Sequence, residues 1–343
     1  MPATLQPAPI REVGAGVPLD EVVSSPTPIV IRGLVADWPL VDAARAGDGP
    51  AIAYLKRFAN DALPAVATIA PPDVAGRIFY NDDLSGFNFR REQIPMSVAL
   101  DTLLKYHDVP DAPLIYLGAT TIDTYLPGFI AGNAVDLGER DALASIWIGN
   151  RSRVPTHQDL PSNLACVAVG HRRFTLFPPE QLRNLYIGPL DLTPAGQPVS
   201  LVDPAAPDLA RFPKFAKAWQ HAQVAELGPG DALFIPGMWW HHIEALDAFN
   251  VLVNYWWRPS AGFGDVPLNA LMLAILSLRD LPAQERAIWQ EVFRHYVFEF
   301  EADAVAGHIP EAARHVLGEL DQAKADNLRA HLMQRLAGVM RRD

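Results

Sequence analysis

The sequence predicts a mainly β protein with helical additions and a helical C-terminal segment, and three observations lead to that prediction. Between about residues 143 and 258, short apolar or alternating runs follow one another, separated by glycine and proline. No long helical pattern lies between these runs, which favours an antiparallel sandwich or barrel over a parallel α/β sheet. After Arg258 and Pro259, the apolar residues change to the three- and four-residue spacing of amphipathic helices.

The order of the predicted elements follows from the same patterns. Residues 1–26 are rich in proline and small residues and are expected to form an extended lead-in. The first clear strand is 28–32, which ends at Gly33, and up to about residue 145 helical and strand-like segments are mixed. In that mixed part, helices are expected at 51–58 and 96–104, and strands at 77–80 and 113–117. The strands expected in the β core are 144–148, 163–169, 173–177, 231–235 and 250–256.

The C-terminal segment carries two amphipathic patterns. Trp289, Val292, Phe293 and Tyr296 mark the first, and Leu328, Leu332, Leu336 and Met340 mark the second. Pro282 and Pro310 stand where helices are expected to start, because proline is tolerated in the first helical turn. The predicted organisation is therefore a lead-in at 1–26, a catalytic β domain at 27–260 and a helical segment at 261–343.

Composition and charge exclude several classes of protein. Half of the 343 residues are hydrophobic and 20% are charged, which is typical of a globular chain and argues against a disordered or fibrous one. The formal net charge of −11 repels phosphate backbones and anionic lipid, so neither nucleic acid nor a membrane surface is an expected partner.

The cysteine content and the N-terminal residues bear on the compartment. Cys166 is the single cysteine, so no intrachain disulfide can form, and its apolar surroundings indicate a buried structural thiol. The N-terminal residues lack the basic and apolar regions of a secretion signal, and no apolar run is long enough to span a membrane. We therefore expect a cytoplasmic protein.

Two motifs indicate a metal site. His157 and Asp159 are two residues apart, so on a strand they project from the same face and can bind one metal ion. An isolated pair of this kind is common on protein surfaces, but a second motif follows downstream: a tight turn at 228–231, an apolar strand, a proline and then His241 and His242. Two imidazoles and one carboxylate form the facial arrangement typical of non-haem Fe(II) oxygenases. Strand alternation alone leaves the choice between His241 and His242 open, and His242 with Glu244 is a weaker alternative pair.

The order of these motifs resembles a known family. Ile148 and Gly149 precede the run 155–159, and 170–179, 229–231, 239–243 and 253–256 follow it. This order is similar to that of the cupin-like branch of the Jumonji-C oxygenases, which includes the asparaginyl hydroxylase of hypoxia-inducible factor. Residues 28–33, 38–39 and 79–82 resemble the N-terminal part of that branch. The resemblance implies a double-stranded β-helix core, of the cupin or jelly-roll type.

The resemblance also implies roles for individual residues. His157, Asp159 and His241 would bind Fe(II). The residues that match the family's 2-oxoglutarate site are Tyr116, Asn163, Arg172, Asn254 and Trp256. Arg172 stands where the family has a lysine that pairs with the far carboxylate, and arginine can form a bidentate pair with such a group. Val154 replaces a threonine, and Gly118 replaces a glutamine that contacts the target in the asparaginyl hydroxylase, so that target is not carried over.

The function implied is an Fe(II)- and 2-oxoglutarate-dependent dioxygenase, expected to act as a hydroxylase with O2 as the oxidant. One alternative is a metal-dependent cupin enzyme that does not use 2-oxoglutarate, and another is an inactive cupin that serves as a binding or scaffold module. The sequence leaves open whether the substrate is a protein side chain or a small metabolite, and whether the product is hydroxylated or demethylated. Both the apolar surface of the C-terminal helices and the resemblance point to a homodimer through those helices.

Overall fold

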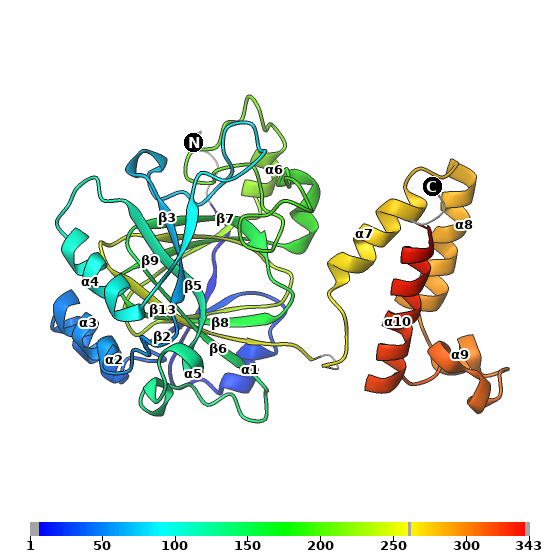
Figure 1. Cartoon of the computed structure of the whole chain (residues 1–343), viewed down its shortest axis with the longest axis horizontal. Coiled ribbons are helices and arrows are strands. Elements are labelled where there is room, and N and C mark those ends of the chain that lie inside the picture. Colours follow the sequence, from blue (N-terminus) through cyan, green and yellow to red (C-terminus); the bar gives the residue numbers. More distant parts are fainter. Residues whose placement is uncertain (1–6, 260–261, 340–343) are drawn as a thin grey trace. The chain divides into compact units, whose positions relative to one another are not determined.

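The computed structural model describes residues 7–259 and 262–339, and the chain divides after Arg258 into two compact units. The first unit contains two β-sheets, and the second is helical (Figure 1). This division lies next to the boundary at residue 260 expected from the change in apolar spacing. Among the described residues, no helix is long and apolar enough to cross a membrane.

The first unit is built from a nine-stranded and a four-stranded sheet. In spatial order, the nine strands are β1 (Arg11–Gly14), β2 (Ile29–Arg32), β11 (Ala232–Ile235), β8 (Ser162–Val169), β13 (Asn250–Trp257), β6 (Leu143–Gly149), β5 (Leu114–Thr121), β3 (Ala65–Ala70) and β4 (Arg90–Ile94). The four strands are β10 (Gln223–Leu227), β9 (Arg172–Phe177), β12 (Trp240–Ala245) and β7 (Ser152–Gln158). All pairings are antiparallel except that of β1 with β2. The predicted mainly β fold with a cupin or jelly-roll core is confirmed.

The central strands of the nine-stranded sheet are buried on both faces, and β8 shows why such a strand has a continuous apolar sequence. Leu164, Cys166 and Ala168 face the larger core on the outer side of the sheet. Ala165 and Val167 face the interior between the two sheets. Because successive strand residues alternate between faces, both sets must be apolar when both faces are covered. Burial also raises the pKa of the Cys166 thiol, which therefore stays protonated.

Helices α2, α3 and α4 lie to one side of the barrel (Figure 1), and their buried residues belong to the larger core. The helices of the first unit are α1 (Leu19–Val23), α2 (Pro39–Arg45), α3 (Asp48–Lys56), α4 (Met96–Tyr106), α5 (Ile122–Tyr125) and α6 (Phe215–Trp219). Short 3-10 turns lie at Pro72–Val74, Phe129–Ala131 and Pro179–Asn184. The helices predicted at 51–58 and 96–104 correspond to α3 and α4.

Most of the predicted strands are confirmed, but two predictions in the N-terminal part are wrong. The five strands of the β core and those at 28–32 and 113–117 correspond to β6, β8, β9, β11, β13, β2 and β5. The segment 77–80 forms only isolated bridges, because Gly76 and Ile78 hydrogen-bond to Arg153 of β7 and the chain then turns back, so that Tyr80 bridges to Phe87. The lead-in is not purely extended either, since it contains β1, which pairs with β2, and α1, whose Val22 is buried.

The second unit has three longer helices and a short one. They are α7 (Pro267–Leu278), α8 (Ala283–Phe293), α9 (Ala302–Ala306) and α10 (Gln322–Val339). A π-helical turn continues α8 from Arg294 to Phe298, and 3-10 turns follow at Glu311–Ala313 and His315–Leu317. The two amphipathic patterns correspond to α8 with its π-turn and to α10, while Met340 lies outside the described residues. Pro282 precedes α8 as expected, but Pro310 starts only a 3-10 turn, and α7 was not predicted.

Candidate metal centre

Three side chains from two strands and one loop meet at one end of the barrel interior. His157 is near the end of β7, Asp159 lies just beyond it, and His241 is near the start of β12. One potential ligand atom from each lies within 4.8 Å of the other two. His241 Nε2 is 3.6 Å from an Asp159 carboxylate oxygen, and the two imidazole rings are 4.3 Å apart. In the described part of the chain, this is the one group of three such residues close enough to share a metal ion.

Backbone carbonyls orient both imidazoles. His157 Nδ1 is 2.8 Å from the carbonyl oxygen of Pro155, and His241 Nδ1 is 3.0 Å from that of Trp239. A carbonyl oxygen only accepts hydrogen bonds, so each Nδ1 carries a proton, and in the neutral tautomer of each ring the Nε2 atom keeps a free lone pair. Burial, reinforced by the neighbouring His157, lowers the pKa of His241 to about 4, so this imidazole is neutral near pH 7. Neutral, oriented imidazoles are what a metal ion requires of its ligands.

A bulge in β7 brings His157 to the inner face. His241 pairs with His157 and Ile243 pairs with Val154, so two residues of β7, Pro155 and Thr156, lie opposite one residue of β12. The extra residue shifts the alternation, and Val154 and His157 therefore both face inward. Proline fits here because β7 is an edge strand of its sheet, where a missing N–H group is tolerated. This bulge was not predicted from the sequence.

His242 lies on the opposite face of β12 from the three grouped residues. Neither of its ring nitrogens has a hydrogen-bond partner among the described residues, and burial lowers its pKa to about 4. Asp203 is the main charge that acts on it, on the outer side of the four-stranded sheet. Glu244 shares that outer face and lies 3.6 Å from Arg173. The structure therefore brings His241 to Asp159, and it does not bring His242 and Glu244 to them.

Arg172 points into the barrel interior without an acidic partner. Only 2% of the residue is exposed, and its Nε has no hydrogen-bond partner among the described residues. Burial lowers the pKa of its guanidinium to about 10, although the nearby Tyr116 opposes this shift. The adjacent Arg173 faces outward and pairs with Glu226 at 2.8 Å. A buried, charged guanidinium without an acidic partner is costly, so this position is suited to an anion.

The other residues predicted for the cosubstrate site also lie on the inner faces of their strands. Tyr116 of β5 is 8% exposed, and burial raises the pKa of its hydroxyl. The charges of Arg172 and Asp159 both act on Tyr116, so both residues lie near it. Asn254 of β13 approaches Asn163 of β8, with 3.4 Å between the two side-chain amides. In the sheet, Trp256 pairs with Asn163.

The sequence analysis missed Trp147 of β6. It lies between Ile146 and Ile148, which face the outer core, so its indole faces inward. Its Nε1 donates a 2.7 Å hydrogen bond to Asn254, and its ring lies 5.9 Å from that of Tyr116. Trp147 could have been identified from the alternation of residues along β6, because β6 pairs with β13, the strand that carries Asn254.

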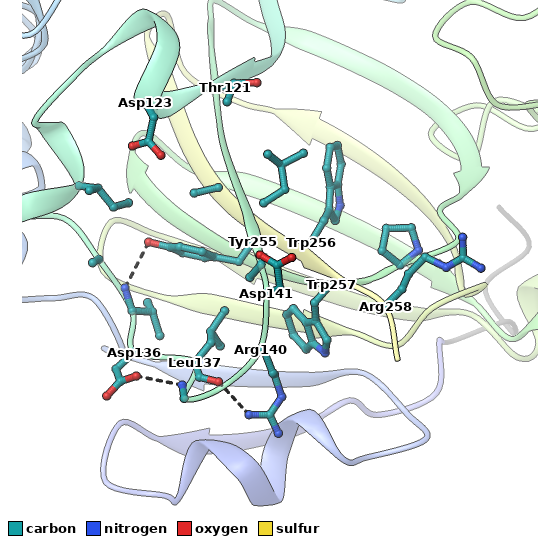
Figure 2. A pocket seen from close by; sticks show the side chains of 18 residues that line it. Thr121, Asp123, Asp136, Leu137, Arg140, Asp141, Tyr255, Trp256, Trp257 and Arg258 are labelled. Atoms are coloured by element: carbon teal, nitrogen blue, oxygen red, sulfur yellow. Dashed lines mark hydrogen bonds between the residues drawn. The ribbon is translucent and has the colours of Figure 1, made fainter. Parts of the chain in front are cut away.

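A cavity of about 810 Å³ opens at the same end of the barrel as the three grouped residues, where β6 begins and β13 ends. Figure 2 shows the Asp141 carboxylate among Tyr255, Trp256 and Trp257. Of the predicted site residues, only Trp256 lines this cavity, and Pro161, two residues after Asp159, lines it as well. The cavity therefore does not contain the three grouped residues, and it shares Trp256 with the predicted cosubstrate site.

Comparison with known proteins identifies the family. The family model described as "Cupin-like domain" matches residues 16–263, which include every residue of the site. The chain belongs to the cupin-like domain family. The prediction of a cupin-like Jumonji-C oxygenase is confirmed at the level of the family.

The names of the relatives of this cupin-like protein differ from one another. Human HSPB1-associated protein 1 is 37% identical over 123 residues, which cover 35% of this chain and 24% of the relative. The zebrafish (Danio rerio) tRNA wybutosine-synthesizing protein 5 is 38% identical over 135 residues, which cover 39% of this chain and 38% of the relative. Human bifunctional peptidase and (3S)-lysyl hydroxylase JMJD7 is 24% identical over 258 residues, 67% of this chain and 77% of the relative. The chain thus spans about a quarter of the first of these relatives and most of the last.

Proposed function

We propose that this cupin-like protein is an Fe(II)- and 2-oxoglutarate-dependent oxygenase that hydroxylates a C–H bond of its substrate. The donor set supports the choice of iron. Two imidazoles whose Nδ1 atoms donate to backbone carbonyls, together with one carboxylate, can form a facial triad through their Nε2 atoms, and that set leaves coordination positions open for a cosubstrate and O2. His157, Asp159 and His241 would hold the ion.

The observation that carries the proposal is the buried, unpaired Arg172. In the pairing of β12 with β9, His241 lies opposite Leu176 and Ala245 lies opposite Arg172, four residues further along both strands. At the rise of a strand, that places the arginine backbone about 13 Å along the sheet from the metal ligand. An arginine side chain and a five-carbon diacid bound at the metal together span such a gap. The guanidinium supplies the positive charge that a distal carboxylate requires.

The residues of the chain then have separate tasks. Iron and 2-oxoglutarate, once bound, would supply oxygen activation and two electrons, which yields succinate, carbon dioxide and a hydroxylated product. Arg172 and Tyr116 would hold the distal carboxylate and thereby fix the position of the reactive end. The apolar inner face, which includes Phe174 and Leu176, excludes water from the space between.

The substrate is proposed only as a class. The cavity beside Trp256 and Asp141 is the place where we expect the target to approach, because Trp256 of the proposed cosubstrate site lines it. The relatives' names include a lysyl hydroxylase and a tRNA-modifying protein. The net charge of −11 disfavours tRNA, so we propose a protein side chain or a small metabolite, in the cytoplasm.

Metal analysis combined with a succinate-release assay tests the proposal. We expect one Fe(II) per chain, and release of succinate that requires both Fe(II) and 2-oxoglutarate. Bound metal with no 2-oxoglutarate binding would instead support a cupin enzyme of another chemistry. Absence of both would support a binding or scaffold module. A screen of peptides and metabolites for a product heavier by one oxygen atom would then identify the substrate.

A further inference from the structure

Trp147 connects the two ends of the proposed cosubstrate pocket. Its ring packs against Tyr116, which lies near Arg172, and forms an edge contact with Trp256 at 5.7 Å. On its other side, its Nε1 donates to the side-chain oxygen of Asn254 at 2.7 Å. Trp147 thus contacts Tyr116 at the distal end of the pocket, and Asn254 and Trp256 near the open end of the barrel. In the sheet, Trp256 pairs with Asn163 and Asn254 pairs with Ser145.

The hydrogen bond from Trp147 fixes the direction of a chain of amides. An indole N–H can only donate, so the Asn254 amide must present its oxygen to Trp147 and its NH2 group to Asn163. Asn163 accepts this second bond through its own oxygen, at 3.4 Å. Its NH2 group is then left on the inner face of β8, and no acceptor for it is found among the described residues. Without a donor at Trp147, both amides could turn over.

Gly118 makes room for this arrangement. A Cβ atom at this position would lie 2.9 Å from the Trp147 ring and 2.9 Å from the Tyr116 ring, closer than real side chains approach. The indole therefore occupies the space that a side chain at position 118 would need. Gly118 and Trp147 form a matched pair in this chain.

We propose that Trp147 is a positioning residue for the cosubstrate. Because its indole orients the Asn254 and Asn163 amides, the pocket presents hydrogen-bond donors to its ligand: the Asn163 NH2, the Arg172 guanidinium and the Tyr116 hydroxyl. A pocket lined by donors suits a dianionic 2-oxo acid, and it disfavours 2-oxo acids whose far end is neutral or cationic. This inference rests on the proposed function and adds a residue that selects the cosubstrate.

The Trp147→Phe variant tests the inference, because it keeps an aromatic ring at position 147 and removes the N–H donor together with one ring of the indole. We expect the KM for 2-oxoglutarate to rise about three- to ten-fold, the contribution of one hydrogen bond. We expect kcat, Fe(II) affinity and thermal stability to change little. Trp289→Phe on the exposed face of α8 is the control, and all its parameters should equal those of the wild type.

The Gly118→Ala variant provides the second arm. In the wild type it should raise the KM for 2-oxoglutarate, because the new methyl group displaces Trp147 and Tyr116. In a Trp147→Leu background the same substitution should have a much smaller effect, since the space is then free. Equal effects of Gly118→Ala in both backgrounds would overturn the inference, and so would an unchanged KM for 2-oxoglutarate in Trp147→Phe. Neither result would contradict the proposed function, provided that the wild-type protein binds 2-oxoglutarate. A wild-type protein that binds no 2-oxoglutarate would overturn both.

Discussion

The barrel interior and the C-terminal helices both contain groups without partners, but of opposite kinds. In the interior most side chains are apolar, and the buried guanidinium of Arg172 has an Nε atom without a hydrogen-bond partner among the described residues. In the helical unit the charged residues largely pair with one another, and the exposed groups are apolar. Neither α7 nor α8 buries a single residue, and Leu276 is 77% exposed. From this difference we predict that the barrel binds ions and polar molecules, whereas the helices bind another apolar surface.

The largest expected effect is the loss of metal binding on the barrel side. Asp159→Ala removes the one carboxylate of the triad, and we expect Fe(II) affinity to fall by more than about 100-fold, since loss of residues that merely support metal ligands already costs up to that amount. Metal content after purification and a direct Fe(II) titration measure this. Asp247→Ala, at the surface beside His171, is the control and should keep its iron. Normal iron content in Asp159→Ala would refute the triad.

The next effect concerns the anion site. Arg172→Ala should weaken 2-oxoglutarate binding by about 2–4 kcal/mol, because a charge-assisted bond is lost from a buried site. That corresponds to roughly 30- to 1000-fold in affinity. Arg172→Lys keeps the charge and should lose much less, and iron binding should survive both changes. The matched control is Arg173→Ala, which alters only the outward-facing neighbour. Tight binding by Arg172→Ala together with weak binding by Arg173→Ala would mean that the wrong arginine was chosen.

The helical unit provides the third test. We predict a homodimer through the C-terminal helices, and Leu276→Glu should weaken it by about ten-fold or more if this exposed residue lies at the centre of the interface. Sedimentation of the wild type and the variant over a range of concentrations measures the association. Glu285→Gln, an exposed polar change on α8, should leave it unaltered. A wild-type chain that sediments as a monomer at micromolar concentration would contradict the prediction.

The smallest effect is a pH dependence of stability at the surface of the first unit. A hydrogen bond to Asp108, with help from Asp48, raises the pKa of His107. The protonated imidazole is therefore favoured in the folded protein, so its stabilising contribution is complete below the unfolded pKa of about 6.5 and disappears as the pH rises through the folded value.

The stability difference between wild type and His107→Ala should accordingly shrink as the pH is raised from about 6 to 8. Because His107 is partly exposed, the change in Tm should be only a degree or so, about what a surface ion pair contributes. Thermal melts at several pH values measure it. His331→Ala, on α10, should show no such trend, and a difference for His107→Ala that grows with pH would have the wrong sign.

Much of the fold could be predicted because the strands of the core have recognisable local sequence patterns. Strands such as β8 and β13 are short apolar runs bounded by glycine, proline or polar residues, and such runs are recognisable without knowledge of their partners. The segment 77–80 has a similar composition, yet it forms only isolated bridges, because Ile78 hydrogen-bonds to Arg153, far away in the sequence, while Phe79 hydrogen-bonds to Asn88. Helix α7 was missed because its residues are apolar almost all round and show little periodicity.

The sequence by itself determined which chemical groups are available: two histidines and an aspartate with suitable spacing, an arginine where relatives have a lysine, and a glycine in place of a glutamine. Only the tertiary structure decided how these groups are used. Whether His241 or His242 faces the metal depends on strand pairing and on the bulge at Pro155, because a shift of one residue turns every side chain to the other face. The protonated Nδ1 atoms depend on backbone carbonyls, which no sequence pattern displays. The isolation of Arg172 and the match between Trp147 and Gly118 arise between strands, where residues distant in sequence come within contact distance.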